Sequence, residues 1–285
     1  MRSNLIGAGK LGKNIAHSLV TKNLITLQSI CNRSLESAKK ACQEIGAGNY
    51  VAHFEQLPKA DLIWICSSDD SIQLIVEQLL NYALIKKDSI VIHCSGALSS
   101  DILSPLKSQG CHIASLHPVK AFKSEPLVAN AFDQVVCTIE GDEVACTWLQ
   151  QTFPELGAEL IKINSEGKAG YHAAASIASN YLITLAACSE ELLLKAGIKK
   201  DQARTIICKL MQGTINNLQE SDLIANALTG PLMRGDSNTI ALHLQAIESP
   251  TTLALYKTAG IATLPLTHHL EQKTRLALEK LLNQM

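Results

Sequence analysis

Through the first half of the chain, short apolar runs alternate with longer stretches whose apolar residues recur at helical spacing. Such runs, bounded by turn residues, predict β-strands, and the helical spacing predicts amphipathic helices. The predicted strands cover residues 4–7, 27–31, 49–52, 62–66, 90–94, 112–116, 135–139 and 159–163, and the predicted helices cover residues 10–22, 35–45, 71–82 and 143–153. This alternation predicts an α/β fold with a doubly wound, mostly parallel sheet.

After Ile163 the strand signals stop and the pattern becomes helical. The helical pattern is interrupted at Gly197, near Ser221, across residues 230–235, and near Pro250 and Pro265. We therefore predict an α/β domain over residues 1–164 and an all-α domain over residues 165–285.

Residues 169–189 carry no formally charged side chain and are numerous enough to span a bilayer. The segment also holds His172, Ser176 and Asn180, which favour a buried core helix with a polar stripe over a membrane span.

The composition of the chain excludes some classes of function. Apolar residues make up 47% of the 285 residues and charged residues 18%, as expected for a folded chain with a sizeable core. A net charge of −1 provides no basic field for nucleic acid or for an anionic membrane. We expect a small-molecule substrate instead of a polyanionic partner.

The nine cysteines are scattered singly and form no C-x-x-C pair. This spacing argues against a zinc site and predicts reduced thiols that serve as small core side chains. Because free thiols persist in reducing compartments and the N-terminus begins with a strand pattern, not a secretory signal, we predict a cytoplasmic protein.

The strongest chemical signal is the sequence Gly7-Ala8-Gly9-Lys10-Leu11-Gly12, a G-x-G-x-x-G between the first strand and the first helix. Gly7 permits a tight turn, Gly9 lets backbone approach a pyrophosphate, and Gly12 allows close packing of helix on strand. We predict a dinucleotide site formed by this loop, with Lys10 and Leu11 included.

The residues at the end of the second strand indicate which dinucleotide binds. NAD sites usually place an acidic residue there, whereas this chain has Asn32, Arg33 and Ser34. A guanidinium can pair with a 2′-phosphate, so the residues predict NADP(H). The alternative is that Arg33 is a solvated residue and that Ser34 caps the helix over residues 35–45.

Loops that follow later strands also lie where open α/β sheets bind ligands. Ser67 and Ser95 are predicted to lie along the cofactor. Asp69 and Asp70 are better explained as N-cap residues of the next helix.

Two histidines stand at strand ends. His93 is expected to be a packing residue. For His117 packing and catalysis are equally favoured, because Pro118 fixes a turn that would aim the imidazole out of the sheet.

Helical spacing puts His172, Ser176, Ser179 and Asn180 on one side of the apolar helix. Buried imidazole and amide groups need partners, so we predict a substrate-facing role for His172 and Asn180 and close packing for Ser179. Farther along, Arg234 lies in a Gly-Pro and Gly-Asp break. It could clamp a substrate carboxylate, or the break could simply connect two helices, with Asp236 as the N-cap of the second.

Together these stretches resemble the Rossmann-like oxidoreductases that carry a helical C-terminal domain of unknown function, relatives of pyrroline-5-carboxylate reductase, ketopantoate reductase and the β-hydroxyacid dehydrogenases. The matching residues are 7–12, 32–34, 93–97, 115–119, 171–180 and 228–236. The resemblance implies NADP binding, an active site between the domains, a helical domain that contributes to substrate binding and to homodimer formation, and 2-dehydropantoate as the leading candidate substrate.

One departure affects the mechanism. β-Hydroxyacid dehydrogenases carry a catalytic lysine four residues before an asparagine, and the corresponding residues here are Ser176 and Asn180. His172 or His117 would then donate the proton, with Lys168 in reserve, while Asn180, Ser176 and Arg234 would orient the substrate. An imine reductase of the pyrroline-5-carboxylate type and a non-catalytic NADP-binding regulatory protein are the alternatives.

Overall fold

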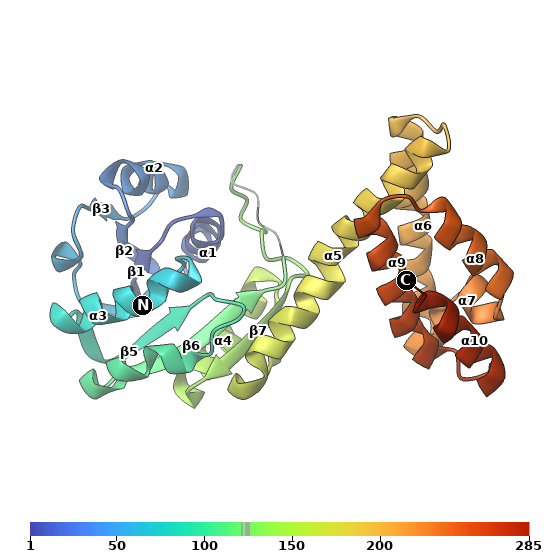
Figure 1. The fold of residues 1–285 in the computed structure, drawn as a ribbon. Coiled ribbons are helices and arrows are strands. Elements are labelled where there is room, and N and C mark those ends of the chain that lie inside the picture. The colour runs from blue at the N-terminus through green and yellow to red at the C-terminus, as the bar shows by residue number, and fades with distance from the viewer. Residues whose placement is uncertain (121, 123–125, 285) are drawn as a thin grey trace. The chain divides into compact units, whose positions relative to one another are not determined.

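A computed structural model describes residues 1–120, 122 and 126–284 and contains one eight-stranded sheet (Figure 1). The strands are β1 (Arg2–Ile6), β2 (Thr26–Cys31), β3 (Asn49–Val51), β4 (Ala60–Ile65), β5 (Ile85–His93), β6 (His112–Pro118), β7 (Val136–Gly141) and β8 (Glu159–Lys162). Their order is β3-β2-β1-β4-β5-β6-β7-β8, and only the β6–β7 pair is antiparallel. The predicted mostly parallel, doubly wound α/β sheet is confirmed.

The strand order also identifies the edge of the sheet at which a ligand would bind, here called the ligand edge. The chain fills the sheet outward from β1 in one direction through β3 and returns to start β4 on the other side of β1. The carboxyl ends of β1 and β4 therefore flank the point where strand order reverses, which is where open α/β sheets bind ligands.

Helices cover both faces of the sheet because strand side chains alternate between two cores. In β4, Leu62 and Trp64 join one core and Ile63 and Ile65 join the other. The first core receives the apolar faces of α1 (Lys10–Thr21), α2 (Leu35–Ile45) and α4 (Glu143–Thr152). The second receives α3 (Asp69–Asn81) and the 3-10 helix η2 (Ser100–Gln109).

Two local details differ from what the sequence predicts. No helix was predicted between β5 and β6, where η2 lies; Pro105 inside it cannot donate an α-helical hydrogen bond, so the segment lacks a regular helical pattern. The N-cap of α3 is Ser68, so the expectation for Asp69 and Asp70 was wrong. Both carboxylates lie in the first turn instead, where negative charge complements the helix dipole.

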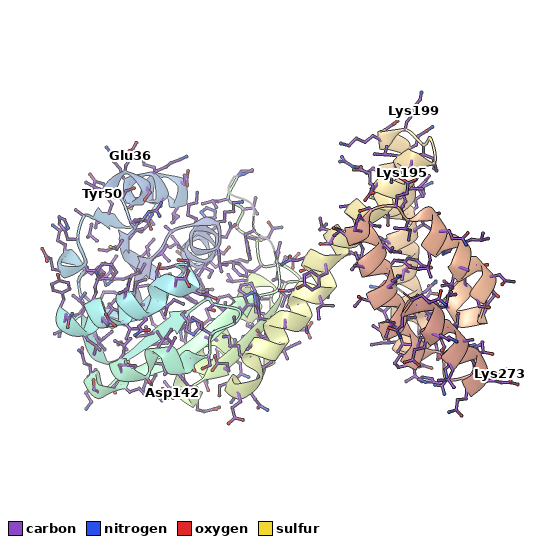
Figure 2. All side chains as sticks on the ribbon, viewed as in Figure 1. Glu36, Tyr50, Asp142, Lys195, Lys199 and Lys273 are labelled. Atoms are coloured by element: carbon purple, nitrogen blue, oxygen red, sulfur yellow. The ribbon has the colours of Figure 1, made fainter. Side chains whose placement is uncertain are left out.

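From Lys168 onward the chain is helical, drawn in yellow to dark red in Figure 1. The helices of this part are α5 (Lys168–Lys195), α6 (Lys200–Glu220), α7 (Pro231–Arg234), α8 (Ser237–Ala246), α9 (Pro250–Thr263) and α10 (Gln272–Leu282). A small apolar cluster of Ile240, Leu264, Leu278 and Leu282 joins α8, α9 and α10. Lys195 and Lys199 project from the tip where α5 turns into α6 (Figure 2).

Two compact units divide the chain within α5: a sheet unit, Met1–Ala178, and a helical unit, Ser179–Met285. We predicted the division after residue 164. The first turns of α5 instead belong to the sheet unit, because the Lys168 side chain is buried there at 2% exposure and Tyr171 contacts His117.

The rest of α5 differs from the buried core helix that its composition predicts. Lys168 is the one buried residue of α5, while Ile177, Tyr181 and Ile183 are 62%, 59% and 71% exposed. Within the described residues, Ser165–Lys195 is the single segment that is long and apolar enough to cross a membrane, by length and composition only. None of the apolar window of this segment is buried among the described residues.

Candidate functional site

The glycine-rich loop follows β1 and has the geometry that the motif predicts. Gly7 has a φ of +88°, and a Cβ there would lie 2.8 Å from the carbonyl carbon of Cys66. A Cβ on Gly12 would lie 2.4 Å from the Gly7 carbonyl oxygen, so α1 packs closely on the loop. Nothing lies within 4 Å of a Cβ on Gly9. The loop is thus closed toward the sheet and open toward a ligand.

A cavity of about 510 Å³ opens beside this loop at the carboxyl ends of β1, β2 and β4. Six predicted residues line it: Gly7, Gly9, Asn32, Arg33, Ser34 and Ser67. Four other predicted residues do not line it, namely Lys10, Leu11, Gly12 and Ser95. Lys10 is exposed and Leu11 packs against the core. Sequence reasoning missed five lining residues that no motif marks, namely Ser37, Phe54, Ser68, Ser71 and Ile75.

The three residues that follow β2 have different structural roles. The Asn32 amide oxygen accepts a hydrogen bond of 2.6 Å from the Ala8 backbone N–H and so fixes the loop. Ser34 caps α2 by accepting from the Ser37 N–H, which confirms that part of the expectation. Arg33 is exposed on the cavity wall, and no ion pair joins it to any part of the chain that the structure describes. Its guanidinium is available to an anion.

The loop after β5 is shaped by His93, which is fully buried. Its Nδ1 accepts from the Ser95 N–H at 3.1 Å, so its Nε2 is left to donate to the Ser99 carbonyl, also at 3.1 Å. Burial, together with the positive charge of Lys168 and against the Ser99 hydrogen bond, lowers the pKa of His93 to about 3. His93 is a neutral support for this loop, in line with its predicted packing role.

Ser95 also serves the loop itself. Its hydroxyl oxygen accepts hydrogen bonds from the N–H groups of Ala97 and Leu98, at 3.2 and 2.9 Å. The predicted cofactor contact of Ser95 stays a prediction. The result of these bonds is a tight turn that places Gly96 at the end of the sheet.

Two imidazoles converge on Gly96. A Cβ on Gly96 would lie 2.5 Å from His172 Nδ1 and 2.9 Å from His117 Nε2, so glycine is the residue that leaves room for both rings. The rings meet edge to face with centroids 5.6 Å apart. His172 Nδ1 is buried and has no hydrogen-bond partner among the described residues. A buried nitrogen without a partner is costly, so a bound polar group is the natural occupant of this position.

Tyr171 sets the orientation of His117. The Tyr171 hydroxyl lies 2.9 Å from His117 Nδ1, which leaves Nε2 facing Gly96. Burial, with smaller contributions from the charges of His172 and Lys168 and an opposing one from Asp69, lowers the pKa of His117 to about 4. His117 is therefore neutral at pH 7. The sequence singled out both histidines but not Tyr171, whose role depends on the contact between α5 and β6.

Lys168 anchors the first turn of α5. Its Nζ donates to Ser115 Oγ and to a Glu140 carboxylate oxygen 3.2 Å away, and both charged side chains are 2% exposed. Glu140 also accepts from the N–H and the hydroxyl of Ser100, at 2.8 and 2.7 Å. Burial lowers the pKa of Lys168, while Glu140 acts in the opposite direction. With its charge compensated, Lys168 holds α5 on the sheet.

The remaining predicted residues are placed as follows. Ser176 is half-buried on α5, and Asn180, which accepts a long hydrogen bond from Ser179, is exposed. Arg234 is exposed and donates through Nε to Asp236 at 2.8 Å. Asp236 stands at the N-cap of α8, but its side chain makes no capping bond there. Substrate contacts of Ser176, Asn180 and Arg234 stay predictions.

All nine cysteines are free thiols in the part of the chain that the structure describes. Within the same residues, no group of three or more His, Cys, Asp or Glu side chains is arranged to hold a metal ion.

Two family profiles match the chain. Residues 1–118 match the profile of a Rossmann-like domain. Residues 135–263 match a profile described as a domain of unknown function, DUF2520. The chain thus combines a Rossmann-like domain with a C-terminal DUF2520 domain, as the sequence motifs suggested. A search of curated proteins finds no match.

Several solved structures share the fold over nearly the whole chain. A Bacteroides fragilis protein, provisionally named an NADP oxidoreductase, is 22% identical with a TM-score of 0.74, and the match covers 94% of this chain and 98% of that one. A Thermotoga maritima protein is 26% identical with a TM-score of 0.72 and the same coverage. Plasmodium falciparum pyrroline carboxylate reductase, solved with NADP bound, is 12% identical with a TM-score of 0.57, covering 99% and 98%.

Proposed function

We propose that the protein is an NADP(H)-dependent oxidoreductase that acts on a small carbonyl acid. The observation that carries this proposal is the convergence of His117 Nε2 and His172 Nδ1 on Gly96, in a loop at the ligand edge of a dinucleotide-binding sheet. A purely structural loop has no need of two imidazole nitrogens that face one small open position.

The residues present fit the cofactor. The loop is open at Gly9, and this residue is the N-cap of α1 without any side-chain capping bond, so the N–H groups of the first turn are available to a pyrophosphate. The cavity of about 510 Å³ continues to Arg33 and Ser34, which suit a 2′-phosphate, and to the aromatic ring of Phe54. A fold neighbour, the Plasmodium enzyme, holds NADP.

When bound, the nicotinamide supplies or accepts the hydride, and the chain's own residues handle the proton and the orientation of substrate. His172 Nδ1 holds the proton that passes to the substrate oxygen. His117 is neutral and donates a hydrogen bond from Nε2 to the same oxygen when the Tyr171 hydroxyl donates to Nδ1. Gly96 keeps the position between the two rings free for the reacting group.

We further propose 2-dehydropantoate as the first substrate to test, because the chain resembles enzymes of that type. Asn180 and Ser176, on the same helix as His172, would orient the substrate. An imine reductase of the pyrroline-5-carboxylate type uses the same hydride chemistry and is the alternative substrate class.

The test is NADPH consumption by the purified chain with a panel that contains 2-dehydropantoate, pyrroline-5-carboxylate and unrelated 2-oxo acids. Turnover of one carbonyl acid supports the proposal, and turnover of the imine alone supports the alternative. NADPH binding with no turnover on any substrate would identify a regulatory protein and contradict the proposed activity.

We also propose that the protein is a cytoplasmic homodimer, joined through α5, on which Ile177 and Ile183 are both exposed. The segment 169–189 lacks formal charges, and a second copy presents the same uncharged surface, so a two-fold contact would bury both.

A further inference from the structure

Cys66 and Cys94 occupy matching positions on neighbouring parallel strands. Ile65 of β4 is paired in register with His93 of β5, so the next residue of each strand is a cysteine. The Cys94 N–H donates to the Ile65 carbonyl at 3.1 Å and continues the ladder to this point. The two sulfur atoms are 3.6 Å apart. Of the cysteines that the structure describes, this is the one pair in sulfur contact.

The pair lies directly beneath the glycine-rich loop. A Cβ on Gly12 would be 3.0 Å from Cys66 Cβ, and a Cβ on Gly7 would be 2.8 Å from the Cys66 carbonyl carbon. Interiors are close-packed, so a shift of the Cys66 side chain is transmitted to the loop and to the start of α1.

The two thiols differ in access. Cys66 is partly exposed, whereas Cys94 is buried at 8% exposure. Burial, followed by the contact with Cys66, raises the pKa of the Cys94 thiol well above its usual range. An oxidant from solvent therefore meets Cys66 first, and Cys94 stands as the resolving thiol in contact with it.

We propose that Cys66 and Cys94 form an oxidative modification site, at which a hydroperoxide produces a disulfide that weakens dinucleotide binding by the glycine-rich loop. The second half of this statement rests on the proposed function, and the first half does not.

The chemistry balances with hydrogen peroxide as oxidant. The Cys66 sulfur attacks one peroxide oxygen, the O–O bond breaks, and Cys66 becomes a sulfenic acid with release of one water. The Cys94 sulfur then attacks the Cys66 sulfur, the S–O bond breaks, and the oxygen leaves as a second water with the Cys94 proton. Two thiols lose two electrons in total and one peroxide gains them.

Bond formation requires movement. A disulfide brings the sulfurs to about 2.05 Å, from the 3.6 Å separation of the thiols. Closing this gap draws the strand ends at Cys66 and Cys94 toward each other. Because the Cβ and the carbonyl carbon of Cys66 are the atoms that approach Gly12 and Gly7, this movement changes the support beneath the loop whose backbone would hold the pyrophosphate. Reduction by a dithiol restores the packing.

Tryptic peptides make the site easy to read. Residues 60–86 contain Cys66 as their one cysteine, and residues 88–107 contain Cys94 as theirs. The reduced whole protein is treated with hydrogen peroxide, alkylated without reductant and digested. The expected product is the two peptides joined, with a mass two hydrogens below their sum, and dithiothreitol should separate them.

In parallel, the Kd for NADPH is measured before and after peroxide, and an increase of about tenfold or more is expected. Cys66→Ser and Cys94→Ala should each abolish the cross-link and keep the reduced Kd after peroxide. Cys208→Ser, which removes an exposed thiol on α6, is the matched control and should respond as the natural sequence does.

Absence of the joined peptides under peroxide would overturn the proposal, as would a cross-link that leaves the NADPH Kd unchanged. If the reduced protein does not bind NADPH at all, the proposed function fails, and the mass measurement still decides the disulfide separately.

Discussion

The Nδ1 atom of His117 and the hydroxyl oxygen of Tyr171 lie 2.9 Å apart and join the end of β6 to the start of α5. The two rings meet edge to face with centroids 5.8 Å apart. Because Nδ1 is occupied by this contact, Nε2 is the nitrogen that faces Gly96. Tyr171 thereby decides which histidine nitrogen is offered to a substrate.

Replacement of Tyr171 by phenylalanine should test this role. The variant keeps the ring but loses one hydrogen bond, so His117 can turn or change tautomer, at a cost of about 1 kcal/mol. We expect kcat to fall about fivefold, which corresponds to this cost, with an unchanged Kd for NADPH. Tyr181→Phe removes an exposed hydroxyl from the same helix and is the control. Equal effects of the two substitutions would contradict the positioning role.

Arg33 should determine the choice between the two dinucleotides. Arg33→Ala removes the exposed guanidinium on the cavity wall and should weaken NADPH binding by about 1–3 kcal/mol, with a smaller effect on NADH. Titration calorimetry with both cofactors measures the difference. Arg204→Ala, at an exposed position on α6, should change neither affinity. An equal loss for NADPH and NADH would show that Arg33 does not recognise the 2′-phosphate.

The sequence predicted most of the sheet because each strand carries its own signal. Leu62, Ile63, Trp64 and Ile65 form an apolar run that is buried on both faces, and such a run is typical of a central parallel strand. The glycine loop was predictable for a similar reason, since its spacing of three glycines is a local property of the chain.

Other features depend on contacts between distant segments. Gly96 has no motif, and its importance arises because His117 and His172, from β6 and α5, reach the same point. Phe54 joins the cavity only after β3 aligns beside β2. The exposure of Ile183 was missed because an apolar helix has the same pattern whether its own chain or another molecule covers it.

Ile183→Glu should therefore disrupt the proposed homodimer. The natural side chain is 71% exposed within one chain, and a second copy would bury it. An unpaired carboxylate in that contact should cost about 3 kcal/mol or more per interface, which raises the dimer Kd by more than about 100-fold. Analytical ultracentrifugation measures the change. Leu276→Glu, at a 56% exposed position on α10, is the control, and a natural chain that is monomeric at micromolar concentration would contradict the proposal.

Because of the buried histidines, the free energy of unfolding should decrease at acidic pH. The pKa of His93 is about 3 in the folded protein against an ordinary value of 6.5, so the unfolded chain binds a proton in this range that the folded chain does not. The contribution of His93 to the free energy of unfolding is fully present above about pH 6.5. It is lost as the pH falls toward 3, by on the order of 4 kcal/mol. His117, whose pKa is lowered to about 4, adds a loss of the same sign.

Urea unfolding at a series of pH values measures this slope. His93→Gln removes the titrating group and should flatten the dependence by about one proton between pH 4 and 6, although it lowers stability at pH 7. His268→Gln, on the helical unit, serves as the control. A slope in the His93→Gln variant equal to that of the natural chain would show that His93 is not the group responsible.

The two histidines that face Gly96 should separate by the size of their effect on turnover. His117 is already neutral above about pH 4, so it cannot donate a proton as an imidazolium at pH 7, which leaves His172 as the proton donor of the pair. His172→Gln should lower kcat by about 10²–10⁴-fold and leave the NADPH Kd nearly unchanged. His117→Gln should lower kcat less, because it loses a hydrogen bond and not the proton. A large loss for His117→Gln with a small one for His172→Gln would place the donor on β6. If both variants keep near-normal turnover on a confirmed substrate, neither imidazole carries the proton, and Lys168→Met becomes the decisive substitution.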